Sequence, residues 1–279
     1  MLIHCPDEKG IILSVTDFIS RNRGNIVDLD QHVDSKRKTF FMRVEWTLND
    51  FSIQREKISA HFDSSVAVKY QMQHKIYFRD EKIRMALMVS KMDHCFNDIL
   101  SRYRSGEWNV EIPLIISNHP DLQEIANRFG IPYHYISVSK QTKAEQEKKQ
   151  LQLLSEYNIE FVVLARYMQI LTEELSNKWF GKCINIHHSF LPSFKGANPY
   201  EQAFSKGVKL IGATAHFVTP DLDEGPIIEQ NIERISHYDS IEDLIRKGND
   251  IESIVLARAV RWHAEKRVLI NGNKTVVFT

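Results

Sequence analysis

The sequence is poor in cysteine, has no long apolar run and carries no excess of charge of either sign. Its three cysteines are Cys5, Cys95 and Cys183, and such an odd, scattered set is typical of a reducing compartment and not of a disulfide framework. The 36 Lys and Arg residues balance 36 Asp and Glu residues, so the net charge favours neither nucleic acid nor an anionic membrane as a partner. Apolar runs such as residues 161–165 fall far below the roughly 20 residues of a membrane span.

The first ten residues, MLIHCPDEKG, lack the basic segment followed by an apolar segment that marks a secretory signal. We therefore expect a cytoplasmic protein. Hydrophobic residues make up 43% and charged residues 26% of the 279 positions, which is a globular composition. A chain of this length is expected to form one large or two ordinary domains, at roughly 100–200 residues per domain.

Residues 1–75 have the pattern of a small α/β domain. Ile11, Val15, Phe18 and Ile19 recur at helical spacing, and the helix is expected to stop at Gly24. Strands are predicted over residues 2–4, 26–33, 39–47 and 66–72, with a second, weaker helix over 53–62. The resulting order is βαββαβ, the split arrangement of ferredoxin-like folds.

After a short polar linker over residues 76–83, residues 84–279 are expected to form a second domain. Buried strands are predicted over residues 83–89, 112–116, 133–136 and 161–164, alternating with helices over 93–104, 121–129 and 142–157. This alternation favours a doubly wound, mostly parallel, Rossmann-like sheet. Asp121 is predicted as a helix N-cap, and the charge run in 142–157 is most simply a solvated face.

Two polar stretches are candidates for the chemistry. In the first, residues 185–196 (NIHHSFLPSFKG), Asn185 and His187 are two positions apart and share one face of an extended segment. An amide beside an imidazole can stabilise an oxyanion and move a proton, although a capping Asn and a His bonded to backbone fit equally well. The second stretch, residues 212–228, offers Asp221, Asp223 and Glu224, and its alternative is an ordinary hairpin turn.

The motifs NIHHSFLPSFKG and HFVTPDLDEGPII resemble those of the folate-dependent formyltransferase family, and LARYMQIL over residues 164–171 resembles its folate-binding loop. The resemblance implies Asn185, His187 and Asp223 as the catalytic residues. His216 matches the second motif's histidine, for which a role in orienting Asp223 or its loop is favoured. The family resemblance implies no cofactor. No HExxH or CxxC spacing is present, so no metal site is expected.

The same resemblance implies a folate substrate lying along residues 164–171 and 218–225. The candidate substrate-binding residues are Leu164, Arg166, Tyr167, Met168, Gln169, Ile170, Leu171, His188, His216 and Val218. Arg166 or Lys195 could meet carboxylates of the folate tail, and His188 is a candidate for contact with water. Met168 and Leu171 fit core packing equally well.

The N-terminal block resembles the ACT domain through CPDEKGI (residues 5–11) and NRGNI (residues 22–26). This resemblance implies an amino-acid effector, with glycine and methionine as candidates, and a homo-oligomer. The backbone N–H groups after the turn could bind a carboxylate, and Asp28 and Asp30 could meet an ammonium group. The candidate effector residues are Asp7, Gly10, Asn25 and Asp28. A block that only holds subunits together is the alternative.

Together the two resemblances imply an enzyme that hydrolyses 10-formyltetrahydrofolate to tetrahydrofolate and formate, supplying formate for purine synthesis and balancing one-carbon pools. An amine acceptor such as glycinamide ribonucleotide needs a glycine-containing phosphate cradle. In glycinamide ribonucleotide formyltransferase, which the motifs also resemble, the loop after the first strand forms this cradle. The corresponding loop of this chain, residues 90–95 (SKMDHC), has no glycine, and Asp93 would repel a phosphate. Water is therefore the predicted acceptor. The alternatives are formyl transfer to that amine and a non-catalytic folate or amino-acid sensor. Transfer to a tRNA is disfavoured, since about a dozen residues follow Arg267.

Overall fold

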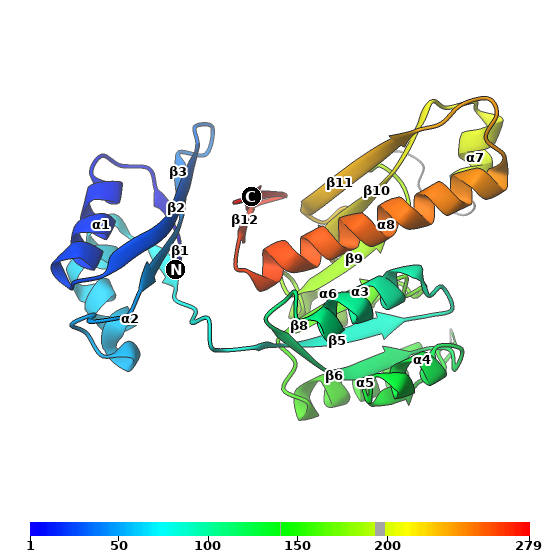
Figure 1. Cartoon of the computed structure of the whole chain (residues 1–279), viewed down its shortest axis with the longest axis horizontal. Coiled ribbons are helices and arrows are strands. Elements are labelled where there is room, and N and C mark those ends of the chain that lie inside the picture. The colour runs from blue at the N-terminus through cyan, green and yellow to red at the C-terminus, as the bar shows by residue number, and fades with distance from the viewer. Residues whose placement is uncertain (140, 193–198) are drawn as a thin grey trace. The chain divides into compact units, whose positions relative to one another are not determined.

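The computed structural model describes residues 1–139, 141–192 and 199–279 (Figure 1). The chain forms two compact units. The first contains Met1–Glu81, Lys266–Asn271 and Val276–Thr279, and the second contains Lys82–Glu265 and Gly272–Thr275.

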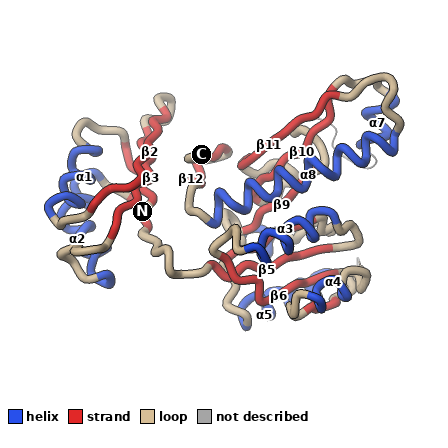
Figure 2. The backbone as a smooth tube through the Cα atoms, in the orientation of Figure 1, coloured by secondary structure: helices blue, strands red, loops and turns tan. Residues whose placement is uncertain are grey.

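The first unit is a four-stranded antiparallel sheet with helices on one face (Figure 2). Its strands lie in the order β2-β3-β1-β4. The helical face of the core is built by Ile11, Val15, Phe18 and Ile19, as their spacing predicts. The elements are β1 (Leu2–Pro6), α1 (Ile11–Arg21), β2 (Asn25–Asp34), β3 (Thr39–Thr47), α2 (Ile58–Phe62) and β4 (Gln73–Lys75). The observed order is βαββαβ, although the last strand lies over Gln73–Lys75 and not over the predicted residues 66–72.

The strand predicted over residues 66–72 is wrong, because the chain stays helical there. A 3-10 turn (Arg55–Lys57) precedes α2, and a π-helical turn (Asp63–Ala67) and a second 3-10 turn (Val68–Tyr70) follow it. Val66, Ala67 and Tyr70 are buried at helical spacing, whereas Val68 is 75% exposed. The prediction of a strand rested on an alternation of apolar residues that included Val68. In the helical chain Val68 points outward and does not belong to the core.

Most of the C-terminal segment, Lys266–Asn271 and Val276–Thr279, groups with the first unit, whereas the expected second domain ran over residues 84–279 without a break. The segment forms a hairpin of β12 (Val268–Asn271) and β13 (Lys274–Val277). Phe278 is buried against Leu2 and Phe41. These two side chains lie on the face of the sheet that the helices leave uncovered, because neighbouring strand residues point to opposite faces.

The second unit is a seven-stranded sheet in the order β11-β10-β9-β8-β5-β6-β7. The strands from β5 to β9 pair in parallel, and β10 and β11 are antiparallel. The mostly parallel sheet is therefore confirmed. Its elements are β5 (Ile83–Val89), α3 (His94–Ser105), β6 (Val110–Ser117), α4 (Gln123–Arg128), β7 (Tyr133–Tyr135), α5 (Lys143–Glu156), β8 (Phe161–Ala165), α6 (Glu173–Lys178), β9 (Cys183–His187), α7 (Pro199–Ser205), β10 (Leu210–Phe217), β11 (Ile227–Arg234) and α8 (Ile241–Ala264).

Helices cover both faces of this sheet. Leu154 of α5 and Leu175 of α6 pack in one core cluster with alternate residues of β5, β6 and β8. On the other side α8 packs along β9, β10 and β11 and against α3 (Figure 1). Asp121 does not cap α4: the helix starts at Gln123, whose N–H donates to the carbonyl of Pro120, so a backbone turn supplies the first bond.

Chain direction on the two sides of β5 explains where a ligand site forms. From β5 the chain passes to β6 on one side, and β8 lies on the other. A crevice opens at the carboxyl ends of parallel strands where the strand order reverses in this way. Ser90, Arg166 and His188 are the residues that follow β5, β8 and β9 at this edge.

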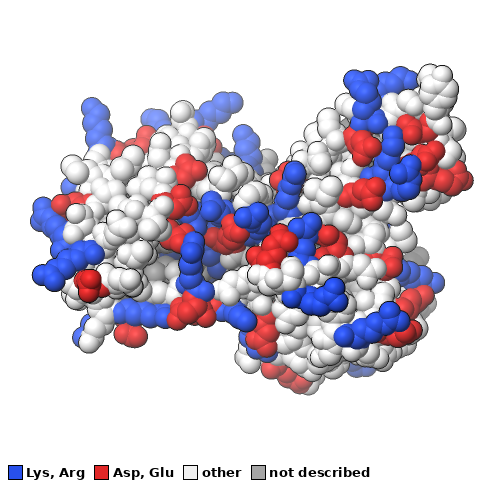
Figure 3. Space-filling view, in the orientation of Figure 1, with Lys and Arg blue, Asp and Glu red and all other residues white. Residues whose placement is uncertain are grey.

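Charged side chains are mixed over the surface. Figure 3 shows basic and acidic residues interspersed on the visible face of each unit, in keeping with the equal numbers of both in the chain. Within the described parts of the chain, no helix has the length and apolar character needed to cross a membrane.

Candidate active site

The register of two neighbouring strands places three of the predicted polar side chains together. Asn185 on β9 pairs with His216 on β10, and His187 pairs with Thr214. Residues two apart on a strand share a face, so the amide and both imidazoles lie on the same side of the sheet. The amide Nδ2 of Asn185 lies 3.3 Å from Nε2 of His216.

The loop after β10 brings Asp223 onto this face. Its Oδ2 lies 3.2 Å from Nδ1 of His187, and its Oδ1 lies 3.6 Å from Nε2 of His216. The backbone of Asp223 is left-handed, with φ of 58°, a conformation that Asp tolerates better than most residues. The loop then passes so close to β10 that a Cβ at Gly225 would lie 1.7 Å from the carbonyl oxygen of Phe217.

The residue pattern alone offered three acids on this loop, of which the family resemblance pointed to Asp223. Asp221 and Glu224 are exposed, whereas Asp223 contacts both histidines. Burial alone raises the pKa of Asp223, but hydrogen bonds and positive charge from His187 and His216 outweigh it and hold that pKa well below its usual range. Asp223 is therefore a carboxylate at every pH at which enzymes ordinarily work.

Hydrogen-bond partners define the proton positions of both rings. Nδ1 of His216 donates to the carbonyl oxygen of Phe217 at 2.9 Å, so in the neutral ring its Nε2 accepts from Asn185. Nδ1 of His187 donates to Asp223, so in the neutral ring its Nε2 carries a lone pair. That Nε2 is buried and has no hydrogen-bond partner among the described residues.

These side chains line a cavity of about 650 Å³, a volume typical of sites for small molecules. All ten predicted substrate-binding residues border it, together with Asn185, His187 and Asp223. Met168 and Ile170 are more than half exposed, whereas Leu164 and Leu171 are buried. The first pair therefore forms a wall of the cavity, and the second pair also packs in the core.

Three side chains that the sequence analysis did not single out for this role hold the loop after β8. Ser90 accepts from the N–H of Met168 at 2.9 Å. Glu147 on α5 accepts from the N–H of Thr172 at 3.0 Å and also from its hydroxyl. Gln150 donates to the Tyr167 hydroxyl at 2.9 Å.

The charged helix α5 is therefore not only a solvated face. Glu147, Gln150 and Leu154 are buried, and their spacing of three and four residues is that of one helix face. This regular spacing of polar residues with Leu154 is the signal that could have revealed them.

The guanidinium of Arg166 has partners within the protein. Its Nε lies 3.4 Å from Oε2 of Glu252, and its Nη1 lies 2.7 Å from Nδ1 of His188. Arg166 also borders the cavity, so contact with the folate tail stays a prediction. Lys195, the other candidate, lies outside the described residues.

Glu252 is the centre of a second buried polar cluster beside the cavity. It is fully buried on α8 and accepts hydrogen bonds from His94 and Tyr200, each at 2.9 Å. A Cβ at Gly248, one turn earlier on α8, would lie 1.9 Å from the Tyr200 hydroxyl, so glycine makes room for that contact. A Glu within the apolar stripe of α8 was the available sequence signal.

Among the described residues, His94, Cys95 and Glu252 form the one group whose ligand atoms lie close enough to hold a metal ion. The surroundings do not suit a cation. Arg166 already places a positive charge 3.4 Å from the Glu252 carboxylate, and burial raises the pKa of the Cys95 thiol far above its usual range. A metal ligand at Cys95 would have to be a thiolate.

The four candidate effector residues do not form one site in the first unit. Through the register of β1, β3 and β2, the loop with Asp7 and Gly10 lies at the end of β2 near Asp34. Asn25 begins that ten-residue strand. The two ends are about 30 Å apart at roughly 3.3 Å per residue. Within one copy of the chain, a single amino acid therefore cannot contact both ends.

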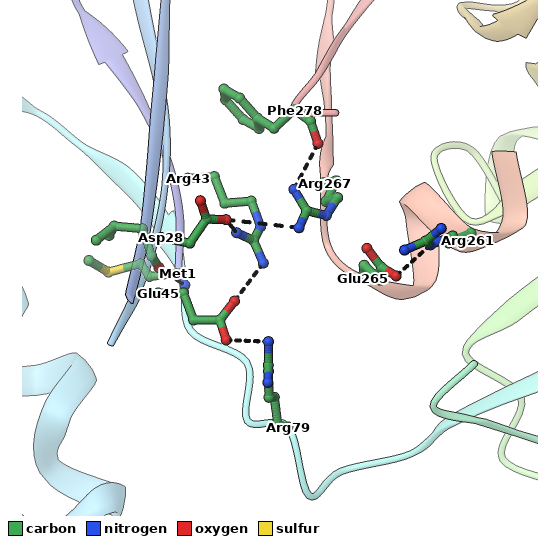
Figure 4. Close-up of polar contacts among 10 residues, drawn as sticks. Met1, Asp28, Arg43, Glu45, Arg79, Arg261, Glu265, Arg267 and Phe278 are labelled. Carbon is green, nitrogen blue, oxygen red and sulfur yellow. Dashed lines mark hydrogen bonds and ion pairs between the residues drawn. The ribbon is translucent and has the colours of Figure 1, made fainter. Parts of the chain in front are cut away.

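Asp28 is also committed to other partners. Figure 4 shows Arg43 between Asp28 and Glu45, with Arg267 directed toward Asp28. Arg43 is buried, and it pairs with Glu45 at 2.8 Å. The carboxylate of Asp28 therefore already pairs with a buried guanidinium, although its side chain is 42% exposed.

The chain is similar to known proteins in sequence and in overall structure. Residues 83–260 match the protein family described as formyl transferase. The formyltetrahydrofolate deformylase of Synechocystis sp. is 52% identical over 278 residues, covering 100% of this chain and 97% of that protein. That of Bacillus subtilis is 46% identical, covering 100% and 93%. The crystal structure of a formyltetrahydrofolate deformylase from Pseudomonas syringae pv. tomato has a TM-score of 0.97 and 43% identity, covering 100% of this chain and 93% of that chain.

The protonation of His188 predicts how stability depends on pH. Burial, and then the charge of Arg166, lower the pKa of His188 from 6.5 to about 4. Between these two pH values the unfolded chain binds a proton at His188 that the folded protein does not, so this residue destabilises the fold as pH decreases. We expect His188→Gln to reduce the loss in Tm between pH 7 and pH 5.

Thermal melts of the wild type and of His188→Gln at pH 7 and at pH 5 test this expectation. His237→Gln, at an exposed histidine, is the control and should leave the difference in Tm as in the wild type. An equal loss of Tm in His188→Gln and wild type would contradict the assigned neutral state.

Proposed function

Since the chain belongs to the formyl transferase family, we propose that it hydrolyses 10-formyltetrahydrofolate to tetrahydrofolate and formate, with Asn185, His187 and Asp223 as catalytic residues. One observation carries the assignment of residues: His187, which lines the cavity, has one ring nitrogen bound to a carboxylate and its second ring nitrogen buried without a partner among the described residues. The activity is supported by relatives that carry the deformylase name and match this chain over its full length.

Asn185 is the proposed oxyanion donor. The formamide of the substrate resists attack until its carbonyl oxygen can take up negative charge. One amide hydrogen of Asn185 is directed to Nε2 of His216, which fixes the plane of the amide and leaves its second hydrogen for that oxygen. Removing one such donor from an enzyme typically costs about 10²–10³ in kcat.

His187 is the proposed base, and Asp223 is its positioning carboxylate. Both oxygens of Asp223 face histidines, so it orients the ring of His187 and stabilises the imidazolium that forms. Nε2 of His187 takes a proton from the attacking water. The same proton then passes to N10 as the bond between N10 and the formyl carbon breaks. This arrangement favours His187 over Asp223 as the group that contacts water.

The loop over residues 166–172 is the proposed pterin site. Ser90, Glu147 and Gln150 hold it from behind, so its outward backbone groups keep a constant pattern of donors and acceptors. Met168 and Ile170 supply exposed apolar surface next to it. Sites for flat heterocycles commonly combine apolar walls with a few fixed polar groups.

The N-terminal unit is proposed as a regulatory or assembly module of ACT type, in a homo-oligomer. Its βαββαβ order supports this proposal, and because Asp7 and Asn25 lie at opposite ends of the sheet, an effector that contacts both would need residues of two subunits. Activity measured against millimolar glycine and methionine separates the two roles, because only a regulatory unit changes the rate.

The proposed reaction predicts formate as the product from water alone. Purified protein mixed with 10-formyltetrahydrofolate should release formate at a rate that glycinamide ribonucleotide does not raise. The measurement is formate and formylglycinamide ribonucleotide in the same samples. Formation of the formylated amine as fast as formate would establish transfer instead, and binding of the folate without either product would identify a sensor.

Substitution of the base or its carboxylate should abolish most of the activity. We expect His187→Ala and Asp223→Ala each to lower kcat by at least about 100-fold, since acid–base catalysis commonly contributes 10²–10⁴-fold. Asp221→Ala, at an exposed acid on the same loop, is the matched control and should keep the wild-type rate. Near-normal formate release by either catalytic variant would refute the site.

The anchor of the folate loop should affect binding more than chemistry. We expect Glu147→Gln to raise KM about 10-fold with little change in kcat, because charged hydrogen bonds worth about 1.5–3 kcal/mol keep the loop in place. Glu145→Gln, at an exposed position on the same helix, is the control. An unchanged KM in folded Glu147→Gln would show that the loop needs no such anchor.

A further inference from the structure

Two neighbouring histidines of the cavity lining, His187 and His188, each have a buried ring nitrogen without a hydrogen-bond partner among the described residues. The rings of His187 and His188 are nearly parallel, with an angle of 20° and centroids 5.0 Å apart. Both residues line the cavity. Nε2 of each ring is buried without a hydrogen-bond partner within the ranges that the structure describes. The mechanism above uses Nε2 of His187 and leaves that of His188 unexplained.

The two nitrogens have opposite hydrogen-bonding character. Nη1 of Arg166 lies 2.7 Å from Nδ1 of His188, and a guanidinium has donors only. Nδ1 of His188 must therefore accept, and the neutral ring carries its proton on Nε2. His187 is the reverse, because its Nδ1 donates to Asp223 and its Nε2 holds a lone pair. Two adjacent rings of the cavity lining thus carry one unpartnered donor and one unpartnered acceptor among the described residues.

The buried cluster around Glu252 fixes this state of His188. Glu252 holds Arg166 through its Nε, and His94 and Tyr200 hold Glu252. Burial and the Arg166 charge lower the pKa of His188 to about 4, so the ring is neutral at neutral pH. The donor on Nε2 is therefore constant under working conditions.

We propose that His188 is a further catalytic residue, which binds the attacking water by donating from Nε2 while the water donates to Nε2 of His187. This inference rests on the proposed hydrolysis. The two rings are nearly parallel with centroids 5.0 Å apart, and a water that makes two hydrogen bonds of about 2.9 Å is of the size to join nitrogens of such neighbouring rings. In the attack the water oxygen bonds to the formyl carbon and one proton passes to His187. The bond to N10 breaks, N10 takes that proton, and the second water hydrogen leaves when formic acid ionises.

The same donor accounts for the choice of water over an amine. Water has two lone pairs, so it can accept a hydrogen bond from His188 with one and attack with the other. A neutral amine has a single lone pair, and a hydrogen bond from His188 blocks it. His188, held by Arg166, is thereby the residue that decides between hydrolysis and transfer.

A pair of substitutions separates the donor from the rest of the side chain. His188→Asn offers an amide oxygen to Arg166 but no atom at the position of Nε2, whereas His188→Gln places an amide donor near that position. Formate release from 10-formyltetrahydrofolate is measured with and without hydroxylamine, which competes with water and gives formylhydroxamate. Tm is recorded for each variant.

We expect His188→Asn to lower kcat for formate release by about 10–100-fold, as for a lost positioning contact, with KM within about twofold of wild type. The ratio of formylhydroxamate to formate should increase at least about tenfold. Without the Nε2 donor, the lone pair of the amine is free to attack and the water is no longer bound in place. His188→Gln should recover most of the rate and the wild-type ratio.

Arg166→Gln is a second test that leaves His188 in place. Without the guanidinium, Nδ1 can carry the proton, Nε2 ceases to be an obligatory donor, and the product ratio should shift in the same direction. If His188→Asn fails to fold, this variant decides the question. An unchanged ratio in either folded variant refutes the role of His188 while formate release by the wild type still stands. A wild type that releases no formate refutes the proposed function itself.

Discussion

The contact between Asp223 and two imidazoles is the constraint on which the rest of the cavity depends. A carboxylate at this depth is unfavourable without partners, and His187 and His216 supply them from neighbouring strands. The antiparallel register of β9 and β10 places these rings on one face, and the close approach at Gly225 lets the loop reach them. The same contact defines which nitrogen of His187 is bound to a carboxylate and which is left without a partner among the described residues.

A second buried carboxylate, that of Glu252, stabilises the opposite tautomer in the neighbouring ring of His188. Glu252 binds the guanidinium of Arg166, which in turn binds Nδ1 of His188. A carboxylate beside one ring and a guanidinium beside the next therefore produce two different tautomers in adjacent histidines. Because α3, α7, α8 and the loop after β8 all contribute to this cluster, its geometry depends on the packing of the whole second unit.

Much of the architecture could be predicted because its signals are local. Continuous apolar strands alternating with helices indicate a parallel sheet wherever they occur, and the Asn185–His187 spacing places both side chains on one face. The exceptions have local causes as well. Val68 completes the alternating pattern of a strand, but the chain is helical there and Val68 is exposed. Asp121 does not cap its helix because the first helical N–H, that of Gln123, already donates to the carbonyl of Pro120.

The amino-acid sequence alone was enough to establish the order of elements, the position of Asn185, His187 and Asp223 in two motifs, and the loop that lines the cavity. It did not establish which polar side chains are partners. Glu147 and Glu252 lie far along the chain from the residues they hold, and a buried carboxylate on a helix looks in sequence like a solvated one. Their roles follow from burial, because a charged group removed from water must be paired, and only packing determines which groups lose contact with water.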